Sequence, residues 1–221
     1  MPRRALIDNR PYLLLGLLFG ITYFFVMDGK VGGSWLALWK GAGVAFLAMY
    51  ALHRGSGHDG MLIALVMTVC ALADVILEFS FLIGGILFAI AHCIALYLYA
   101  ANRRARLSVS QIALAIALVA APPAIAAMLS YPQANWWLAT AYAALVGVMA
   151  AGAWTSRFPR YRTGLGAVFF VISDLVLVAR EAGQLAPAVA EWIVWPTYFA
   201  GQFLIVTGVI QTIRGDLPSE N

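Results

Sequence analysis

Long apolar stretches separated by short polar segments are the dominant pattern of this 221-residue chain. About eight stretches approach the ~17–25 residues that an α-helix needs to cross a bilayer. The pattern therefore predicts an all-α fold, a polytopic membrane helix bundle of about eight transmembrane helices. The predicted helices are Pro11–Met27, Trp35–Leu52, Met61–Glu78, Phe81–Ala101, Ser108–Leu129, Trp136–Trp154, Gly164–Arg180 and Trp192–Ile213.

The polar segments between these helices leave no room for a soluble domain, so residues 1–221 are expected to form a single transmembrane domain. The first apolar stretch follows Arg3 and Arg4, as the core of a secretory signal would. However, the sequence from Val26 to Lys30 contains no small-residue cleavage site. We therefore expect this stretch to remain as the first helix.

Composition excludes a soluble protein. Hydrophobic residues make up 63% of the chain and charged residues only 11%, whereas soluble domains carry about 25% charged residues. Cys70 and Cys93 both fall within apolar stretches. They predict no disulfide framework and are interpreted as ordinary small apolar residues.

Basic residues gather on one side of the predicted bundle. The net charge is +4, and 11 of the 14 lysines and arginines fall on the side that holds both termini. Lys30 and Arg180 fall on the other side, and Lys40 lies within a helix. By the positive-inside rule both termini are cytoplasmic, as expected for a multi-pass protein of a bacterial inner membrane. Topology thus explains the arginines without nucleic-acid binding. The 11 residues are Arg3, Arg4, Arg10, Arg54, Arg103, Arg104, Arg106, Arg157, Arg160, Arg162 and Arg214.

Most tryptophans agree with this topology. Tryptophan is enriched where a membrane protein crosses the interface between lipid and water. Six of the seven cluster at helix ends assigned to the outer interface, namely Trp35, Trp39, Trp136, Trp137, Trp192 and Trp195.

Two aspartates interrupt the apolar stretches in similar settings, Leu72-Ala73-Asp74-Val75-Ile76-Leu77 and Ile172-Ser173-Asp174-Leu175-Val176-Leu177. A carboxyl group in hydrocarbon costs a few kcal/mol, so it usually has a function or a partner. The two settings are 100 residues apart, with four predicted helices per interval. The chain is therefore compatible with a parallel repeat of two four-helix halves, about 1–106 and 107–221.

The predicted topology brings the polar residues of the helices to similar depth. Lys40, Asp74, Glu78, His92 and Asp174 would all lie in the outer half of the membrane. Asp74 and Glu78 are four residues apart and share a helix face. The sequence therefore predicts one central polar cluster, to which Tyr198 and Gln202 would add a second i, i+4 pair.

The ordered set of these residues resembles the YhhN family, whose characterised members are lysoplasmalogenases. The resemblance covers roughly Trp35 to Gln211. Two positions depart from the family pattern: Ala73 stands where glycine is usual, and Gly41 stands where proline is common. The residues that carry the resemblance are Asp74-Val75-Ile76-Leu77, Phe81, Gly85, Phe88 and His92, together with Lys40, Tyr142, Met149, Ser173, Asp174, Tyr198 and Gln202.

This resemblance implies hydrolysis of the vinyl ether bond of a lysoplasmalogen within the membrane. We expect no cofactor and no metal in the site. The products would be a fatty aldehyde and a glycerophospho-base. Such chemistry needs proton delivery, an oxocarbenium-like state and attack by water, which glycosidases achieve with two carboxyl groups. Asp74 and Asp174 would divide those roles. The supporting or substrate-binding residues would be Lys40, Glu78, His92, Tyr142, Ser173, Tyr198 and Gln202.

Other interpretations remain open at this stage. Paired intramembrane carboxylates and a repeat also occur in proton-coupled transporters, and a non-catalytic scaffold is a third class. Asp74 and Lys40 could form a structural ion pair, Glu78 could be merely solvated, and His92 could be a packing residue. A zinc hydrolase using Asp74, Glu78, Asp174 and His92 lacks a ligand-spaced motif. The sequence does not indicate the oligomeric state.

Overall fold

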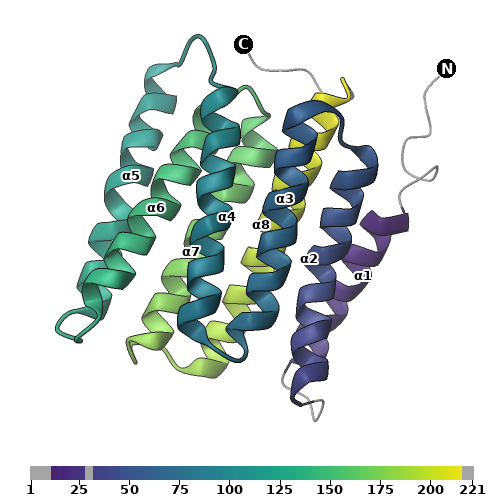
Figure 1. Ribbon diagram of the computed structural model, residues 1–221. Coiled ribbons are helices and arrows are strands. Elements are labelled where there is room, and N and C mark those ends of the chain that lie inside the picture. Colours follow the sequence, from purple (N-terminus) through teal and green to yellow (C-terminus); the bar gives the residue numbers. More distant parts are fainter. Residues whose placement is uncertain (1–10, 28–31, 216–221) are drawn as a thin grey trace.

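The computed structural model describes residues 11–27 and 32–215. These residues form eight long α-helices, with a short π-helical turn (η1) directly before the seventh (Figure 1), and no strand longer than an isolated bridge. The all-α prediction is confirmed. The elements are α1 (Pro11–Val26), α2 (Ser34–Arg54), α3 (Gly57–Leu77), α4 (Phe81–Ala101), α5 (Val109–Ser130), α6 (Trp136–Thr155), η1 (Arg160–Gly164), α7 (Leu165–Glu181) and α8 (Pro187–Ile213).

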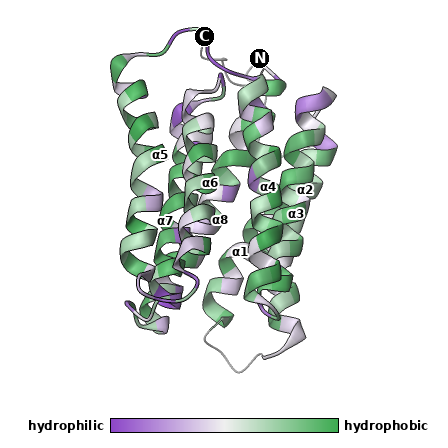
Figure 2. Ribbon diagram, turned by 60° about the vertical axis from the view of Figure 1, so that its left-hand side comes forward, coloured by the Kyte–Doolittle hydropathy of each residue, from purple (hydrophilic) through white to green (hydrophobic). Residues whose placement is uncertain are grey.

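Seven of the described helices, counting η1 and α7 as one, are 20 to 27 residues long and apolar enough to cross a bilayer, and α1 is a shorter apolar helix of 16 residues. Figure 2 shows hydrophobic residues along the helices and hydrophilic residues mainly at their ends. The protein is therefore a multi-pass integral membrane protein. α1 begins and α8 ends at the same end of the bundle. The cytoplasmic location of that end stays a prediction, and Arg3, Arg4, Arg10 and Lys30, which contribute to it, lie outside the described residues.

Helices extend beyond the apolar stretches from which they were predicted. α3 begins at Gly57 rather than Met61, and α8 begins at Pro187 rather than Trp192. Proline fits the first turn of a helix because its missing N–H has no intrahelical partner there. Hydropathy marks only the part of a helix that lies in hydrocarbon, so it misses the turns that continue into the polar interface.

The helices run up and down, with α8 in a central position. α8 packs against α1, α2, α3 and α7, whereas α5 contacts only α6 and α7 among the described helices. In Figure 1, α1 and α5 lie on opposite flanks of the bundle. Residues from α3, α4, α6, α7 and α8 can therefore meet in the interior.

Close packing of α7 on α8 depends on two glycines. A Cβ atom built on Gly166 would lie 2.7 Å from the carbonyl oxygen of Gly201, and one built on Gly201 would lie 2.7 Å from the carbonyl oxygen of Gly166. Small residues let the backbones of membrane helices approach this closely. The crossing fixes α7, which carries Asp174, against α8, which carries Tyr198.

A polar cluster ties three helices together at the arginine-rich end. Arg157 Nη2 donates to Asp59 Oδ2 at 3.1 Å, and Arg157 Nε donates to Asn102 Oδ1 at 2.5 Å. Asn102 Nδ2 in turn donates to Asp59 Oδ1 at 3.1 Å. These bonds connect the first turn of α3 with the residues that follow α4 and α6, far from the polar residues of the interior.

One tryptophan departs from the predicted interfacial position. Trp192 is 60% exposed, as expected, but Trp195 is 4% exposed. The indole Nε1 of Trp195 donates to the carbonyl oxygen of Gly20 at 2.7 Å. Trp195 therefore belongs to the core between α1 and α8, where its ring also packs against Tyr23.

Candidate active site within the membrane

Asp74 lies at the interface of α3 and α8, where it is 2% exposed. The hydroxyl of Tyr198 donates to Asp74 Oδ2 at 2.7 Å, and Gln202 Nε2 donates to the Tyr198 hydroxyl at 3.2 Å. Tyr198 and Gln202 are four residues apart, so both side chains leave α8 on one face. The predicted association of these three residues is confirmed.

Lys40 pairs with Glu78 rather than with Asp74. Lys40 Nζ lies 2.6 Å from Glu78 Oε1, and the side chains are 13% and 36% exposed. The alternative interpretation, that Lys40 and Asp74 form a structural ion pair, is therefore wrong. Glu78 follows the last residue of α3, at the partly open end of the helix, and so it reaches Lys40 from outside the core. Asp74 still lies in the electrostatic field of both charged groups.

Asp174 lies on α7 and has its own set of partners. The hydroxyl of Tyr142, on α6, donates to Asp174 Oδ2 at 3.1 Å, and Ser173 Oγ lies 3.4 Å from Asp174 Oδ1. His92 Nε2, on α4, lies 3.3 Å from the Tyr142 hydroxyl. Because the Tyr142 hydroxyl donates its hydrogen bond to Asp174, it can only accept a hydrogen bond from the His92 ring. The three side chains form a hydrogen-bonded chain through which a proton can be relayed.

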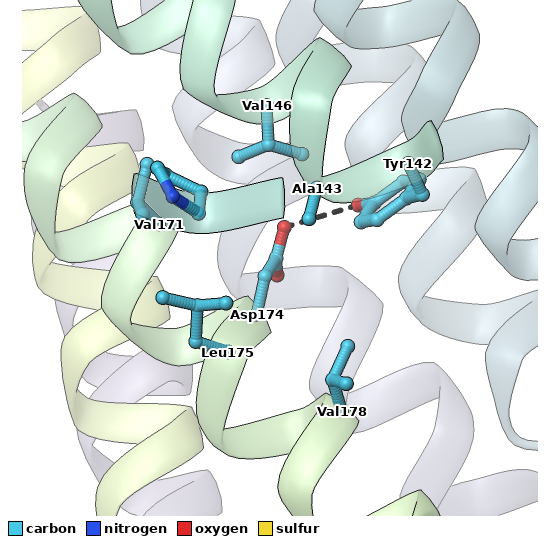
Figure 3. Close-up of a pocket in the computed structure, with 8 residues that line it drawn as sticks. Tyr142, Ala143, Val146, Val171, Asp174, Leu175 and Val178 are labelled. Atoms are coloured by element: carbon cyan, nitrogen blue, oxygen red, sulfur yellow. Dashed lines mark hydrogen bonds between the residues drawn. The ribbon is translucent and has the colours of Figure 1, made fainter. Parts of the chain in front are cut away.

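Asp174 also borders a small cleft between α5, α6 and α7. Figure 3 shows its carboxyl group directed toward Tyr142, with Ala143, Val146, Val171, Leu175 and Val178 around it. The cleft has a free volume of about 10 Å³, counted as the space that the centre of a water molecule can reach. That is close to the space needed for one water molecule. Apart from Asp174 and Tyr142, the lining residues are apolar.

The two carboxyl groups belong to one interior, although they do not share a hydrogen bond. The buried Cys70 side chain lies near Gln202 and within electrostatic range of both Asp74 and Asp174. The predicted single polar cluster is therefore composed of two hydrogen-bonded networks, with Cys70 within electrostatic range of both, and of the Lys40–Glu78 pair at the side.

Aromatic rings form a continuous wall between the networks. The ring centroids of His92 and Phe170 are 4.7 Å apart, those of Phe170 and Tyr198 are 5.2 Å apart, and those of Phe88 and Tyr198 are 5.7 Å apart. Aromatic faces stabilise nearby positive charge. This wall therefore suits a reaction in which a cationic state forms between two carboxyl groups.

Sequence reasoning missed two of these residues. Cys70 was interpreted as an ordinary apolar residue, yet it lies one helical turn before Asp74 and faces the same interior. The i, i+4 spacing from Asp74 was the available signal. Phe170, four residues before Asp174, had the same spacing, but an aromatic residue in an apolar helix has no distinguishing pattern.

The polar residues do not form an evident metal site. Within residues 11–27 and 32–215, no three His, Cys, Asp or Glu side chains are grouped closely enough to hold a metal ion. The set proposed for zinc is divided, because Glu78 is paired with Lys40 and His92 contacts Tyr142.

Comparison with known proteins identifies the family. A sequence model of the YhhN family matches residues 35–209, which include every residue of the site. No curated protein and no solved structure has a significant match. Since the family match covers most of the chain, this protein belongs to the YhhN family.

Proposed function

We propose that this protein is a lysoplasmalogenase-like hydrolase that cleaves the vinyl ether bond of a lysophospholipid inside the membrane. The observation that carries this proposal is the pair of membrane-embedded carboxyl groups, each hydrogen-bonded to a tyrosine, at one aromatic-walled interior. Family membership supports the same class of reaction. An intramembrane carboxyl pair of this kind is costly and is rarely without a function.

The reaction divides into proton transfer and hydration. An acid donates a proton to the alkenyl carbon remote from the ether oxygen, which leaves an oxocarbenium ion at the adjacent carbon. A base removes a proton from water as its oxygen attacks that carbon. The hemiacetal then collapses, so that one water molecule and one vinyl ether give an aldehyde and an alcohol. The two carboxyl groups supply the acid and the base, as in glycosidases.

The surroundings of the two aspartates suggest how the roles divide. Asp174 is hydrogen-bonded to Tyr142, which contacts His92, and this chain of side chains leads to Asp174 rather than to Asp74. Asp74 instead accepts a hydrogen bond from Tyr198, whose hydroxyl Gln202 holds in position. We therefore assign the acid to Asp174 and the base or cation-stabilising group to Asp74. His92 and Tyr142 would return a proton to Asp174.

Aldehyde release by the purified protein in detergent tests the proposal. Asp74→Asn and Asp174→Asn keep side-chain size while removing the acid, and each should lower kcat by about 10² to 10⁴, the range for acid–base groups. Glu181→Gln, which removes an exposed carboxylate on α7, is the matched control and should retain activity. Absence of aldehyde from correctly folded wild-type protein, with both ethanolamine and choline substrates, would refute the proposal.

Proton-coupled transport is the second candidate, because the chain of Asp174, Tyr142 and His92 crosses from α7 to α4 and could bind and release a proton. Aldehyde release without any ion gradient favours the hydrolase. Uptake of a solute into proteoliposomes, driven by a pH gradient and abolished by Asp174→Asn, would favour the transporter.

A further inference from the structure

Helix α1 lies outside the part of the chain that the family model matches, which begins at residue 35. Among the described helices α1 packs only on α2 and α8. Its contact with α8 falls one turn before Tyr198, whose hydroxyl donates to Asp74. An element outside the family match therefore contacts the part of α8 that carries a residue of the candidate site.

Trp195 is the residue of α8 that joins this helix to α1. Its indole N–H donates to the carbonyl oxygen of Gly20 at 2.7 Å, and the side chain is 4% exposed. The ring also lies against Tyr23, with the two centroids 4.4 Å apart. A buried indole N–H needs an acceptor, because an unpaired donor in an apolar interior is costly. The hydrogen bond therefore fixes the orientation of the Trp195 ring.

The close approach of α1 and α8 at this point depends on the absence of a side chain at Gly20. A Cβ atom built there would overlap the ring of Phe199. Phe199 is stacked on Trp195, with the centroids 5.7 Å apart and an angle of 19° between the ring planes. Trp195 and Phe199 are four residues apart and share one face of α8. α1 thus holds two consecutive turns of α8.

α8 is interrupted at the same point. Pro196 lies inside the helix and has no N–H, so the carbonyl oxygen of Trp192 loses its helical donor. Trp195 directly precedes the proline, and Tyr198 follows two residues after it. The ring centroids of Trp195 and Tyr198 are 5.7 Å apart. Contacts from outside α8 therefore help to set the position of Tyr198, and the bond to α1 reaches it through one ring.

We propose that Trp195 is a positioning residue of the site: anchored to Gly20 of α1, it holds the Tyr198 ring where the hydroxyl donates to Asp74. The strength of a hydrogen bond falls steeply as its geometry departs from linearity. A small shift of the Tyr198 ring would therefore weaken its 2.7 Å bond to Asp74. The role of Asp74 in catalysis rests on the proposed function, but the positioning of Tyr198 does not.

A double-mutant cycle tests whether Trp195 acts through Tyr198. Trp195→Phe keeps an aromatic ring and removes the hydrogen bond to Gly20. It should lower kcat for aldehyde release by about 3- to 10-fold, the usual effect of one neutral hydrogen bond, with KM nearly unchanged. In a Tyr198→Phe background the same substitution should have little further effect, since residues that act together are not additive. An equal loss in both backgrounds would overturn the proposal.

Trp39→Phe is the matched control. The indole N–H of Trp39 donates to Thr22 Oγ1 at 3.1 Å, so this substitution also removes a hydrogen bond between a tryptophan and α1. That bond joins α1 to α2 rather than to α8. The kcat of this variant should stay close to that of the wild type. A loss as large as that of Trp195→Phe would show that any loosening of α1 lowers activity, and would refute a specific role for Trp195.

Infrared spectroscopy tests the positioning without substrate. The carboxyl band of Asp74 is the band that Asp74→Asn removes from the spectrum of the full chain in detergent, and its frequency reports the hydrogen bond from Tyr198. Trp195→Phe should shift this band in the same direction as Tyr198→Phe, and Trp39→Phe should not shift it.

The infrared result separates the positioning from the reaction. A shifted band, with no aldehyde from any form of the protein, would keep the positioning and reject the proposed reaction. An unshifted band in folded Trp195→Phe protein would overturn the positioning. If Trp195→Phe fails to fold, benzothienylalanine at position 195 replaces the indole N–H by sulfur at nearly constant ring size, and the same two outcomes apply.

Discussion

At the scale of single residues, the interior consists of side chains with different tasks. Asp74 and Asp174 face different partners, so two residues in similar sequence settings acquire different surroundings. Gln202 and Ser173 make neutral hydrogen bonds that hold the neighbouring groups in position. Lys40 and Glu78 form an ion pair at the side of the site, and it is partly exposed.

Lys40 is expected to bind the phosphate of the substrate, which would replace Glu78 as its partner. Lys40→Gln should raise KM by about 10- to 100-fold, since a hydrogen bond to a charged group contributes about 1.5–3 kcal/mol. kcat should change less than KM. The measurement is steady-state aldehyde release over a range of substrate concentrations.

Arg180→Gln provides the matched control for Lys40, because Arg180 is a basic residue at the same predicted side and pairs with Glu181. Its KM should stay close to that of the wild type. A fall in kcat at constant KM for Lys40→Gln would instead show that Lys40 acts on the chemical step through Asp74.

At the scale of elements, helix crossings decide which residues meet. The α7–α8 crossing brings Phe170 against Tyr198, and α4 lies against α6, where His92 contacts Tyr142. The helices themselves could be predicted from hydropathy, with errors only at their ends. Their neighbours could not, because apolar helices offer many similar faces for packing and short loops constrain only consecutive pairs.

Gly201→Ala should destabilise the α7–α8 crossing. The added methyl group would meet the Gly166 carbonyl oxygen, and overpacking of this kind costs about 1–3 kcal/mol. A lower midpoint of thermal unfolding in detergent, accompanied by reduced aldehyde release, is the expected result. Gly85→Ala is the control, because nothing lies within 4 Å of its Cβ position. Equal destabilisation of both variants would show that the crossing is not tightly packed.

At the scale of the whole molecule, charge and helix number determine how the bundle lies in the membrane. α1 begins and α8 ends at one end, where the described arginines of the α4–α5 and α6–α7 connections also lie. The parallel repeat stays a prediction. The first helices of its two halves, α1 and α5, lie on opposite flanks of the bundle.

Cysteine labelling of intact cells checks the predicted orientation. In a Cys93→Ala background, Asn135→Cys lies between α5 and α6 on the predicted outer side, and Ala105→Cys lies between α4 and α5 on the predicted cytoplasmic side. Both positions are exposed. A membrane-impermeant maleimide should label Asn135→Cys directly and Ala105→Cys only after permeabilisation. The reverse pattern would invert the orientation and contradict the positive-inside assignment.

The sequence by itself determined the fold class, the approximate positions of the helices and the polar residues of the candidate site other than Cys70, because hydropathy and intramembrane charge are properties of single segments. Only the tertiary structure decided the pairings. In it Lys40 pairs with Glu78, and the hydroxyls of Tyr198 and Tyr142 donate hydrogen bonds to Asp74 and Asp174. It also placed Cys70 within electrostatic range of both aspartates, and Asp174 at a cleft. These contacts depend on the rotation and crossing of helices far apart in the chain, which packing sets and which local sequence does not encode.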